Sequence, residues 1–302
     1  MTAQIIDGKQ VAADMRAELK AEVAELAKKG IVPGLAVVLV GEDPASKSYV
    51  TAKERACEEM WIYSDDNRLA ADTSQEELMA LIEKLNNNPK INGILVQLPL
   101  PDGLNEAEVL LAIDPAKDVD GFHPVNVGKM VVGERAFLPC TPHGVIQLLI
   151  RSGVKLEGAE VVIVGRSNIV GKPLANMLIQ KNATGNATVT VCHTRTRDLA
   201  EHTRRADIVI AAAGRPDTVT ADMVKDGVVV IDVGVNRVGE KPSKKDPNRM
   251  VAILKGDVDF EAVKEKASLI TPVPGGVGPM TITMLLYNTV ESAKRAAGID
   301  EN

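Results

Sequence analysis

The sequence predicts an α/β protein with two wound α/β domains around a cleft, and three observations lead to this prediction. The chain has 302 residues, about twice the size of an ordinary domain. Hydrophobic residues make up 45% of it and charged residues 25%, the balance of a globular protein with a sizeable core. Short apolar runs alternate with stretches of helical spacing, a rhythm typical of parallel sheets covered by helices.

The first half is expected to fold as β-α-β-α-β. Apolar residues recur at helical spacing over residues 11–29, and a glycine ends that helix. Residues 35–40 and 93–98 are continuous apolar runs of strand length. Helical stretches at residues 46–60 and 74–86 lie between these two runs.

The second half repeats this rhythm after a break in composition. We expect the domain boundary near residues 139–142, at the end of a segment rich in proline and glycine. The strands expected beyond it are residues 160–164, 188–191, 207–211 and 228–233.

Three later segments complete the expected organisation. Residues 238–250 are polar and are expected to form a loop, whereas residues 271–281 hold three prolines and three glycines and are expected to form neither helix nor ladder. The amphipathic residues 282–297 are expected to pack back on the first domain. The predicted domains are therefore residues 1–139 with the returning helix 281–302, and residues 140–280.

Charge and composition exclude several classes of function. A net charge of −6 and a pI near 5.4, with 2% aromatic residues, argue against a sequence-independent nucleic-acid protein. No apolar run approaches the ~20 residues that span a bilayer, and no signal segment is evident, so we expect a cytosolic protein. The three cysteines have no metal or disulfide spacing and are expected to be small buried residues.

A glycine turn in the second half has the features of a phosphate site. Residues 161–173 read as a strand, a tight turn and a helix start, with Pro173 in the first helical turn. Amides at such a helix start attract a pyrophosphate, and Gly165 and Gly171 would let the backbone approach it. The spacing departs from GxGxxG, with Ser167 where the second glycine belongs, so a plain strand-turn-helix remains the alternative.

The end of the next expected strand indicates which dinucleotide is bound. An NAD enzyme normally carries an acidic residue there to hold the ribose hydroxyls. Residues 192–197 read CHTRTR instead, and Arg166 lies in the glycine turn. Basic and hydroxyl groups suit a 2′-phosphate, so the sequence favours NADP over NAD and a Rossmann-type parallel sheet in the second domain.

A second group of polar residues lies in the first half. Ser46, Tyr49 and Lys53 share one face of an expected helix, and Gln97 ends a strand that meets the same sheet edge. A lysine partly buried there would have a lowered pKa and could exchange protons near neutral pH, beside an aromatic ring suited to a planar ligand. The alternative is an ordinary exposed helix with a surface lysine.

Two aspartates in the segment KDVDGFHP raise the question of a metal. Asp118 and Asp120 have no further acidic or histidine ligands at compatible spacing, so no metal is expected. We expect Asp120 to accept a hydrogen bond from an NH group of a ligand. The alternative for Asp120 is a solvated aspartate of a turn.

Six ordered segments make the chain resemble the family of bifunctional methylenetetrahydrofolate dehydrogenase/methenyltetrahydrofolate cyclohydrolase enzymes of bacterial one-carbon folate metabolism. The resemblance covers nearly the whole chain. It implies NADP-dependent oxidation of 5,10-methylenetetrahydrofolate, then hydrolysis to 10-formyltetrahydrofolate, by a homodimer. The segments are PASKSYVTAK (44–53), GILVQLPLP (93–101), KDVDGF (117–122), PCTPHG (139–144), GRSNIVGKP (165–173) and TPVPGGVGPMT (271–281).

The resemblance also implies roles for residues of the first domain. Lys53 would be the general acid/base of the cyclohydrolase step, and Gln97 would tune it through a hydrogen bond. Tyr49 would line the folate pocket, and Asp120 would bind the edge of the pterin. The first domain would then be the catalytic, folate-binding one.

The second domain would bind NADP. The nucleotide contacts implied by the resemblance come from Gly165, Arg166, Ser167, Thr194 and Val235. A further segment, Pro274, Gly275 and Gly276, would shape the pocket beside the nicotinamide and the folate.

Three positions depart from the family pattern without removing a catalytic group. Trp61 stands where a glycine often follows the catalytic helix, so the approach to the next strand there is expected to change. His143 stands where lysine is common, and Val235 where isoleucine is common. Two rival functions remain at this point: a dehydrogenase without hydrolysis, which Lys53 and Gln97 disfavour, and a non-catalytic NADP-binding regulator.

Overall fold

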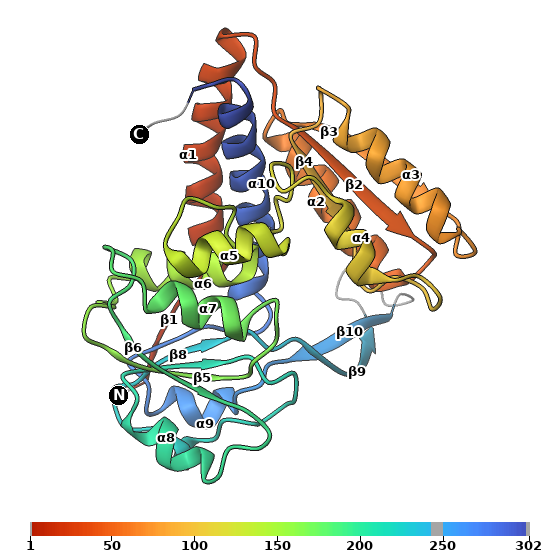
Figure 1. Cartoon of the computed structure of the whole chain (residues 1–302). Coiled ribbons are helices and arrows are strands. Elements are labelled where there is room, and N and C mark those ends of the chain that lie inside the picture. Colours follow the sequence, from red (N-terminus) through yellow and green to blue (C-terminus); the bar gives the residue numbers. More distant parts are fainter. Residues whose placement is uncertain (1, 243–249, 300–302) are drawn as a thin grey trace. The chain divides into compact units, whose positions relative to one another are not determined.

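The computed structural model describes residues 2–242 and 250–299, and the chain divides into two compact units. One comprises Ala13–Cys140 and Ile282–Asn302 and contains a three-stranded sheet. The other comprises Met1–Ala12 and Thr141–Thr281 and contains a six-stranded sheet. We refer to them as the three-stranded unit and the six-stranded unit (Figure 1).

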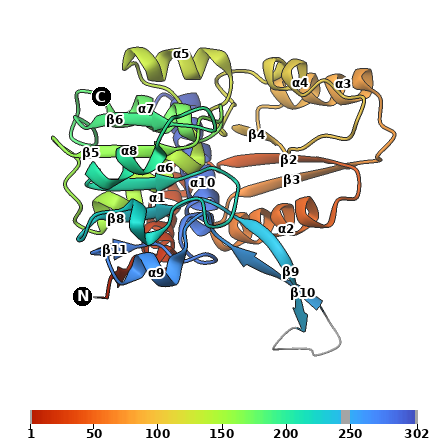
Figure 2. The ribbon, with the colours of Figure 1, turned by 90° about the horizontal axis from the view of Figure 1, so that it is seen from below.

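The sheet of the three-stranded unit is parallel, in the order β3-β2-β4. Helix α2 covers one face, and α3 and α4 cover the other (Figure 2). The central strand is buried over its whole length, which is why its sequence is a continuous apolar run. The elements are β2 (Gly34–Val40), α2 (Pro44–Glu59), β3 (Tyr63–Leu69), α3 (Gln75–Asn86), β4 (Gly93–Val96), α4 (Glu106–Ala112) and α5 (Pro124–Val132).

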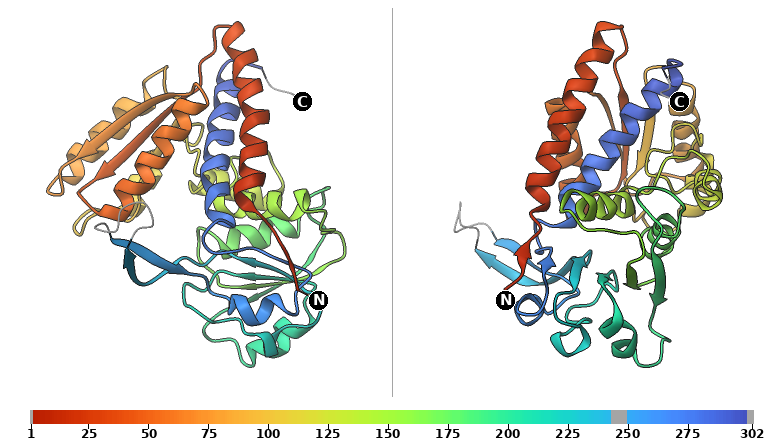
Figure 3. Two further views of the ribbon diagram at one scale, coloured as in Figure 1. Left: turned by 180° about the vertical axis from the view of Figure 1, so that it is seen from behind. Right: turned by 90° about the vertical axis from the view of Figure 1, so that its left-hand side faces the viewer.

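Two long helices, α1 (Gly8–Lys28) and α10 (Val277–Ala296), run side by side (Figures 1 and 3), and this unit contains α1 from Ala13 and α10 from Ile282 onwards. Lys294 Nζ donates to Glu22 at 2.7 Å, and Arg16 Nε donates to the Thr283 hydroxyl at 2.9 Å. Asn288 of α10 donates to the carbonyl of Val119 at 2.8 Å. Helix α10 is thereby fixed to the KDVDGF segment.

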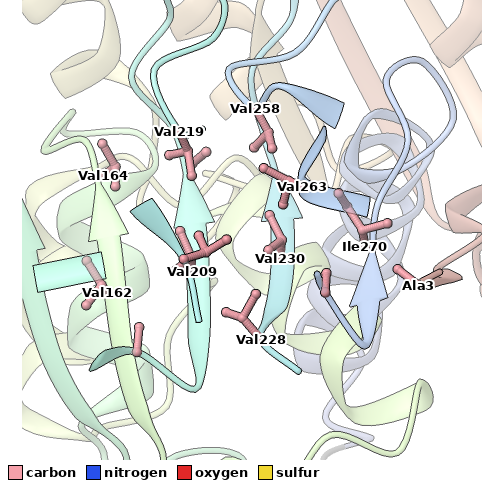
Figure 4. Packing of buried hydrophobic residues seen from close by; sticks show 14 of the residues in the cluster. Ala3, Val162, Val164, Val209, Val219, Val228, Val230, Val258, Val263 and Ile270 are labelled. Atoms are coloured by element: carbon pink, nitrogen blue, oxygen red, sulfur yellow. The ribbon is translucent and has the colours of Figure 1, made fainter. Parts of the chain in front are cut away.

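The sheet of the six-stranded unit is parallel throughout, in the order β1-β11-β8-β7-β5-β6. Figure 4 shows its core, in which Val162, Val209 and Val230 from three adjacent strands point to one face of the sheet. The strands are β1 (Gln4–Ile5), β5 (Glu160–Val164), β6 (Thr188–Cys192), β7 (Ile208–Ala211), β8 (Val229–Asp232) and β11 (Leu269–Ile270).

Short helices and one hairpin complete the six-stranded unit. The hairpin of β9 (Asn236–Pro242) and β10 (Met250–Lys255) is antiparallel and extends from the sheet (Figure 3). The helical elements are α6 (Cys140–Arg151), α7 (Gly171–Leu178), α8 (Leu199–Arg205), the 3-10 turn η1 (Ala221–Met223) and α9 (Phe260–Lys264). Within the described residues, no helix is long and apolar enough to cross a membrane.

The predicted α/β fold with a Rossmann-type parallel sheet is confirmed, and the predicted strands agree with the structure to within two residues. The polar-loop prediction for residues 238–250 is wrong at both ends, where the chain forms β9 and β10. Strand β9 is polar and largely exposed, so it carries no continuous apolar run, and the apolar run of β10 lies almost wholly beyond residue 250. The middle of that segment, residues 243–249, lies outside the described residues.

The prediction that residues 271–281 form neither helix nor ladder is wrong at the C-terminal end. Helix α10 begins at Val277, with Pro279 in its first turn. A proline is tolerated there because first-turn amides have no helical acceptor in any case. The described segment from Thr271 to Gly276 is irregular, as predicted.

Candidate active site and dinucleotide loop

The first candidate site is centred on Lys53, which α2 holds against the end of β4. Its side chain is buried, with 8% of the residue exposed, and Nζ donates to Gln97 Oε1 at 3.0 Å. Gln97 is itself fixed, because Nε2 donates to the Leu98 carbonyl at 2.7 Å and the backbone amide donates to the Val38 carbonyl at 2.8 Å. These bonds orient the amide so that its oxygen faces the lysine.

Burial and a neighbouring charge shift the pKa of Lys53 in opposite directions. Burial lowers the pKa of Lys53, because the charged form loses its hydration, and the negative charge of Asp120 opposes this by raising it. Burial raises the pKa of Asp120 to about 6, while the Lys53 charge acts in the opposite direction. The predicted lowering of the lysine pKa is confirmed in direction.

The two aspartates of the KDVDGF segment have different environments. Asp118 is buried and accepts hydrogen bonds from the amides of Phe122 and His123, at 3.2 and 2.8 Å, and from Asn126 Nδ2 at 2.8 Å. It therefore holds the turn, whereas Asp120 is half-buried and interacts electrostatically with Lys53. Among the described residues, no cluster of three or more acidic, histidine or cysteine side chains could hold a metal ion.

The predicted helix face of Ser46, Tyr49 and Lys53 differs in exposure along its length. Ser46 is 4% exposed, and its amide donates to Asp43 Oδ1 at 2.7 Å, which caps the helix. Tyr49 is 50% exposed. Its ring is thus available to a planar ligand, while the lysine one turn further is buried.

Two residues of this site carry no sequence signal of their own. Cys140 lies near Lys53 and Asp120, and its pKa is raised well above the ordinary value by burial and by the Asp120 charge, so the thiol stays neutral. Asn288 of α10 donates to the carbonyl of Leu138 at 2.9 Å as well as to Val119. Sequence reasoning classed Cys140 as a small buried residue, and all three cysteines are buried.

Trp61 ends α2 in the left-handed conformation, with φ +58°. The Ile62 amide donates to the Cys57 carbonyl at 3.0 Å, the bond that closes a helix with a left-handed residue before it. The indole ring is exposed, with Lys20 Nζ 4.4 Å from its centre. The backbone therefore keeps the form that a glycine would adopt, and the expected change of the strand approach does not occur.

The second candidate site is the turn after β5, in the six-stranded unit. Gly165 has φ +137°, and a Cβ there would lie 2.0 Å from the carbonyl oxygen of Ala212, which follows β7. A Cβ on Gly171 would lie 2.2 Å from the oxygen of Gly165. Only glycine fits at either place. In the strand order, β5 lies between β6 and β7, the switch point outside which α/β sheets bind ligands.

Ser167 explains why the glycine spacing is irregular. Its Oγ accepts the amides of Val170 and Gly171 at 3.1 and 3.4 Å, and its carbonyl accepts the Lys172 amide at 3.1 Å. The helix-start amides expected to hold a phosphate are thus engaged inside the chain. A phosphate would instead meet the exposed turn from Arg166 onwards.

The end of β6 presents basic and hydroxyl groups beside this turn. Cys192 is buried and pairs with Val164, and the chain then turns through a bond from the His193 amide to Thr196 Oγ1 at 2.9 Å. Thr194 and Arg195 are exposed. The glycine turn and this acid-free strand end fit a dinucleotide with a 2′-phosphate.

The remaining predicted nucleotide and substrate residues lie in two other loops of the six-stranded unit. Val235 follows β8 and is 50% exposed. Pro274, Gly275 and Gly276 follow β11, and a Cβ on Gly276 would lie 2.7 Å from the Pro272 oxygen. Both loops leave the carboxyl ends of parallel strands, as the turn at Gly165 does.

Comparison with known proteins identifies two family models along the chain. "Tetrahydrofolate dehydrogenase/cyclohydrolase, catalytic domain" matches residues 6–120, and "Tetrahydrofolate dehydrogenase/cyclohydrolase, NAD(P)-binding domain" matches residues 139–297. The bifunctional protein FolD of Dehalococcoides mccartyi is 60% identical over 300 residues, which are 99% of each chain. That of Moorella thermoacetica is 60% identical over 295 residues, 98% of this chain and 100% of the relative.

Solved structures of similar proteins match nearly the whole chain. The bifunctional FolD of Campylobacter jejuni has 50% identity and a TM-score of 0.89, with 97% of this chain and 99% of that chain covered. The FolD of Trypanosoma brucei, solved with NADP cofactor and an inhibitor, has 39% identity and a TM-score of 0.91, with coverage of 98% and 99%.

Proposed function

We propose roles for the residues of both sites on the premise that this chain belongs to the tetrahydrofolate dehydrogenase/cyclohydrolase family. It is a bifunctional enzyme of the FolD type, an oxidoreductase and a hydrolase. It oxidises 5,10-methylenetetrahydrofolate to the 5,10-methenyl form with NADP and hydrolyses that product to 10-formyltetrahydrofolate. The observation that carries the residue roles is the buried pair of Lys53 and Gln97.

In our proposal the six-stranded unit holds NADP. Gly165, Arg166, Ser167, Thr194 and Val235 contact it, and the Arg166 guanidinium meets the 2′-phosphate through charge-assisted hydrogen bonds. When bound there, NADP supplies the acceptor of the hydride. The folate nitrogens themselves drive the departure of the hydride, so this step requires orientation of the reactants and no acid from the chain.

The hydrolysis requires a proton carrier, and in our proposal Lys53 is that group. Its lowered pKa provides a neutral amine that accepts a proton at Nζ as water adds to the methenyl carbon. The ammonium then returns this proton to the ring nitrogen as the bond between that nitrogen and the one-carbon unit breaks. The hydroxyl on the same carbon becomes the formyl carbonyl, and its proton leaves to solvent. Gln97 keeps Nζ in place throughout, because Gln97 is itself fixed. Its side-chain amide donates to the Leu98 carbonyl, and its backbone amide donates to the Val38 carbonyl.

Folate recognition is assigned mainly to the three-stranded unit. The exposed ring of Tyr49 packs against the planar ring of the substrate, and Gln97 contacts it beside Lys53. Asp120 accepts a hydrogen bond from an NH group at the edge of the pterin. The segment from Pro274 to Gly276 of the six-stranded unit is assigned to the substrate as well. The predicted domains, residues 1–139 with 281–302 and residues 140–280, would thus be the folate-binding and NADP-binding parts, except that Met1–Ala12 belong to the six-stranded unit.

The family resemblance also supports a cytoplasmic homodimer. Light scattering of the purified protein measures its mass directly. A value twice the 32.2 kDa of one chain is expected, and the mass of a single chain would contradict the dimer.

One absorbance experiment separates this function from its rivals. The enzyme is mixed with NADP and 5,10-methylenetetrahydrofolate, and the near-ultraviolet bands of NADPH and methenyltetrahydrofolate are followed. NADPH should form while the methenyl compound appears and then declines. A methenyl band that accumulates without decay would indicate a dehydrogenase alone, and no change in either band would indicate a non-catalytic regulator.

A further inference from the structure

Two buried carboxylates that the proposed function leaves unused lie beneath the loops at the carboxyl ends of β7 and β8. Asp257 is fully buried and Asp232 is 3% exposed. The loops above them are residues 212–214 and residues 233–236, and the second contains Val235. Buried acids are rarely tolerated unless their oxygens are satisfied, so the partners of these two groups indicate what the groups do.

Asp257 joins the two loops to each other. Its Oδ2 accepts the amides of Ala213 and Gly214 at 2.6 and 2.8 Å, and its Oδ1 accepts Asn236 Nδ2 at 2.8 Å. Asp257 is itself anchored, because its carbonyl accepts the amides of Thr218 and Val219 at 2.7 and 3.1 Å. Val258, the next residue, packs beside Val219 in the core of this unit (Figure 4).

Asp232 connects the loop after β8 to Asp257 and Val258. Its Oδ1 accepts the amides of Gly234 and Asp257 at 3.0 and 2.9 Å, and its Oδ2 accepts the Val258 amide at 3.0 Å. The backbone amide of Asp232 donates to Thr271 Oγ1 at 2.7 Å. Because that bond comes from the backbone, the two carboxylates themselves connect only the loops at residues 212–214 and 233–236.

The backbone passes so close to the two carboxylates that only glycine fits beside them. A Cβ on Gly234 would lie 2.2 Å from Asp257 Oδ1, and one on Gly256 would lie 1.8 Å from Asp232 Oδ2. Burial and the Asp257 charge raise the pKa of Asp232 to about 6, while the backbone amides that it accepts act to lower it. The group therefore remains a hydrogen-bond acceptor at neutral pH.

We propose that Asp232 and Asp257 are positioning residues for the dehydrogenase reaction. Their carboxylates hold the loops at residues 212–214 and 233–236 in the arrangement that receives the nucleotide. This proposal rests on the proposed function, since Val235 is assigned there to the nucleotide. Neither acid touches a reacting atom.

The test is Asp257→Asn, which swaps one acceptor oxygen for an amide donor. The new NH2 group cannot accept a hydrogen bond. It faces another donor in either orientation of the side chain, which is Asn236 Nδ2 in one and the amides of Ala213 and Gly214 in the other. We expect the KM for NADP in the dehydrogenase assay to rise about tenfold, the effect of one unsatisfied buried donor. Cyclohydrolase activity on supplied methenyltetrahydrofolate, without nucleotide, should be unchanged, because Lys53 lies in the other unit.

Two further variants make the result specific. Asp259→Asn is the matched control, because that side chain makes no capping hydrogen bond to the described residues of α9. It should leave both activities unchanged. The double variant Asp257→Asn with Asn236→Asp reverses donor and acceptor along the same contact, and it should recover most of the lost NADP affinity. If Asp257→Asn is insoluble, Asp232→Asn replaces it with the same expected split between the two activities.

A wild-type KM for NADP in Asp257→Asn would overturn the proposal, as would a parallel loss of both activities and of melting temperature. Failure of the underlying function would look different. In that case the unsubstituted enzyme would form no NADPH, whatever the variants did.

Discussion

The lysine site and the dinucleotide loop use opposite means to present reactive groups. At the lysine site, buried side chains fix one another, with Lys53 held by Gln97 and its charge balanced against Asp120. At the loop, two glycines and the Ser167 cap make a tight backbone that leaves Arg166 exposed. The difference teaches that substitutions at the first site should change proton chemistry, whereas substitutions at the second should change affinity.

The largest expected effect is on hydrolysis. Lys53→Met removes the proton carrier and should lower cyclohydrolase kcat by about 10²- to 10⁴-fold, the usual contribution of a general acid/base. NADP affinity, measured by fluorescence titration, should stay nearly unchanged. The control is Lys47→Met on the same helix, whose lysine pairs with Glu42 and should be dispensable. An equal loss of nucleotide binding in Lys53→Met would contradict the role.

A substitution in the dinucleotide loop should change NADP affinity and leave hydrolysis unchanged. Arg166→Ala removes one charge-assisted contact to the 2′-phosphate and should raise the KM for NADP by about 10- to 100-fold. Steady-state kinetics with NAD should change little, because NAD lacks that phosphate. Lys181→Ala, an exposed lysine beyond α7, serves as the control. Equal use of NAD and NADP by the unsubstituted enzyme would refute the assignment.

The charge balance at the lysine site predicts a shift in pH dependence. The negative charge of Asp120 raises the pKa of Lys53, so Asp120→Asn should lower that pKa further. If neutral Lys53 is the base, the rising limb of the cyclohydrolase pH profile moves to lower pH. Asp102→Asn, which changes an exposed aspartate, should leave the profile in place. A move of the limb to higher pH would show that Asp120 does not act through its charge.

The smallest expected effect concerns Trp61, which lies outside both sites. A left-handed conformation costs an L-residue ~1–2 kcal/mol, and the exposed Lys20 cation over the ring returns ~0.5–1 kcal/mol. Glycine also loses more entropy on folding. Trp61→Gly should therefore raise the free energy of unfolding in urea by at most about 1 kcal/mol. A clear destabilisation would mean that the ring contributes more than its contact with Lys20.

Local sequence patterns predict some parts of both sites. The strand, turn and helix start at residues 161–173 follow from glycine and proline positions, and the acid-free end of β6 is read directly. Lys53 and Gln97 were placed at one sheet edge by strand and helix periods. Their hydrogen bond, and the restraint that Asn288 places on the KDVDGF segment from 169 residues away, depend on long-range packing.

Other features could not be predicted from the sequence, because they depend on contacts between distant residues and not on local patterns. Asp118 and Asp120 are two residues apart in similar sequence, and only the folded turn distinguishes a buried structural acid from one facing Lys53. The pairing of β1 with β11 joins residues 265 positions apart and brings Met1–Ala12 into the six-stranded unit. Local sequence does not indicate β9, because that strand is polar and largely exposed, and the apolar residues 251–254 of β10 lie beyond the predicted loop.

The most direct test of this division of labour follows both absorbance bands for Lys53→Met and Arg166→Ala in parallel. Lys53→Met should form NADPH while methenyltetrahydrofolate accumulates without decay. Arg166→Ala should form NADPH slowly at limiting NADP, yet hydrolyse supplied methenyltetrahydrofolate at the wild-type rate. A parallel loss of both activities in each variant would contradict the account, because the two sites would then act as one.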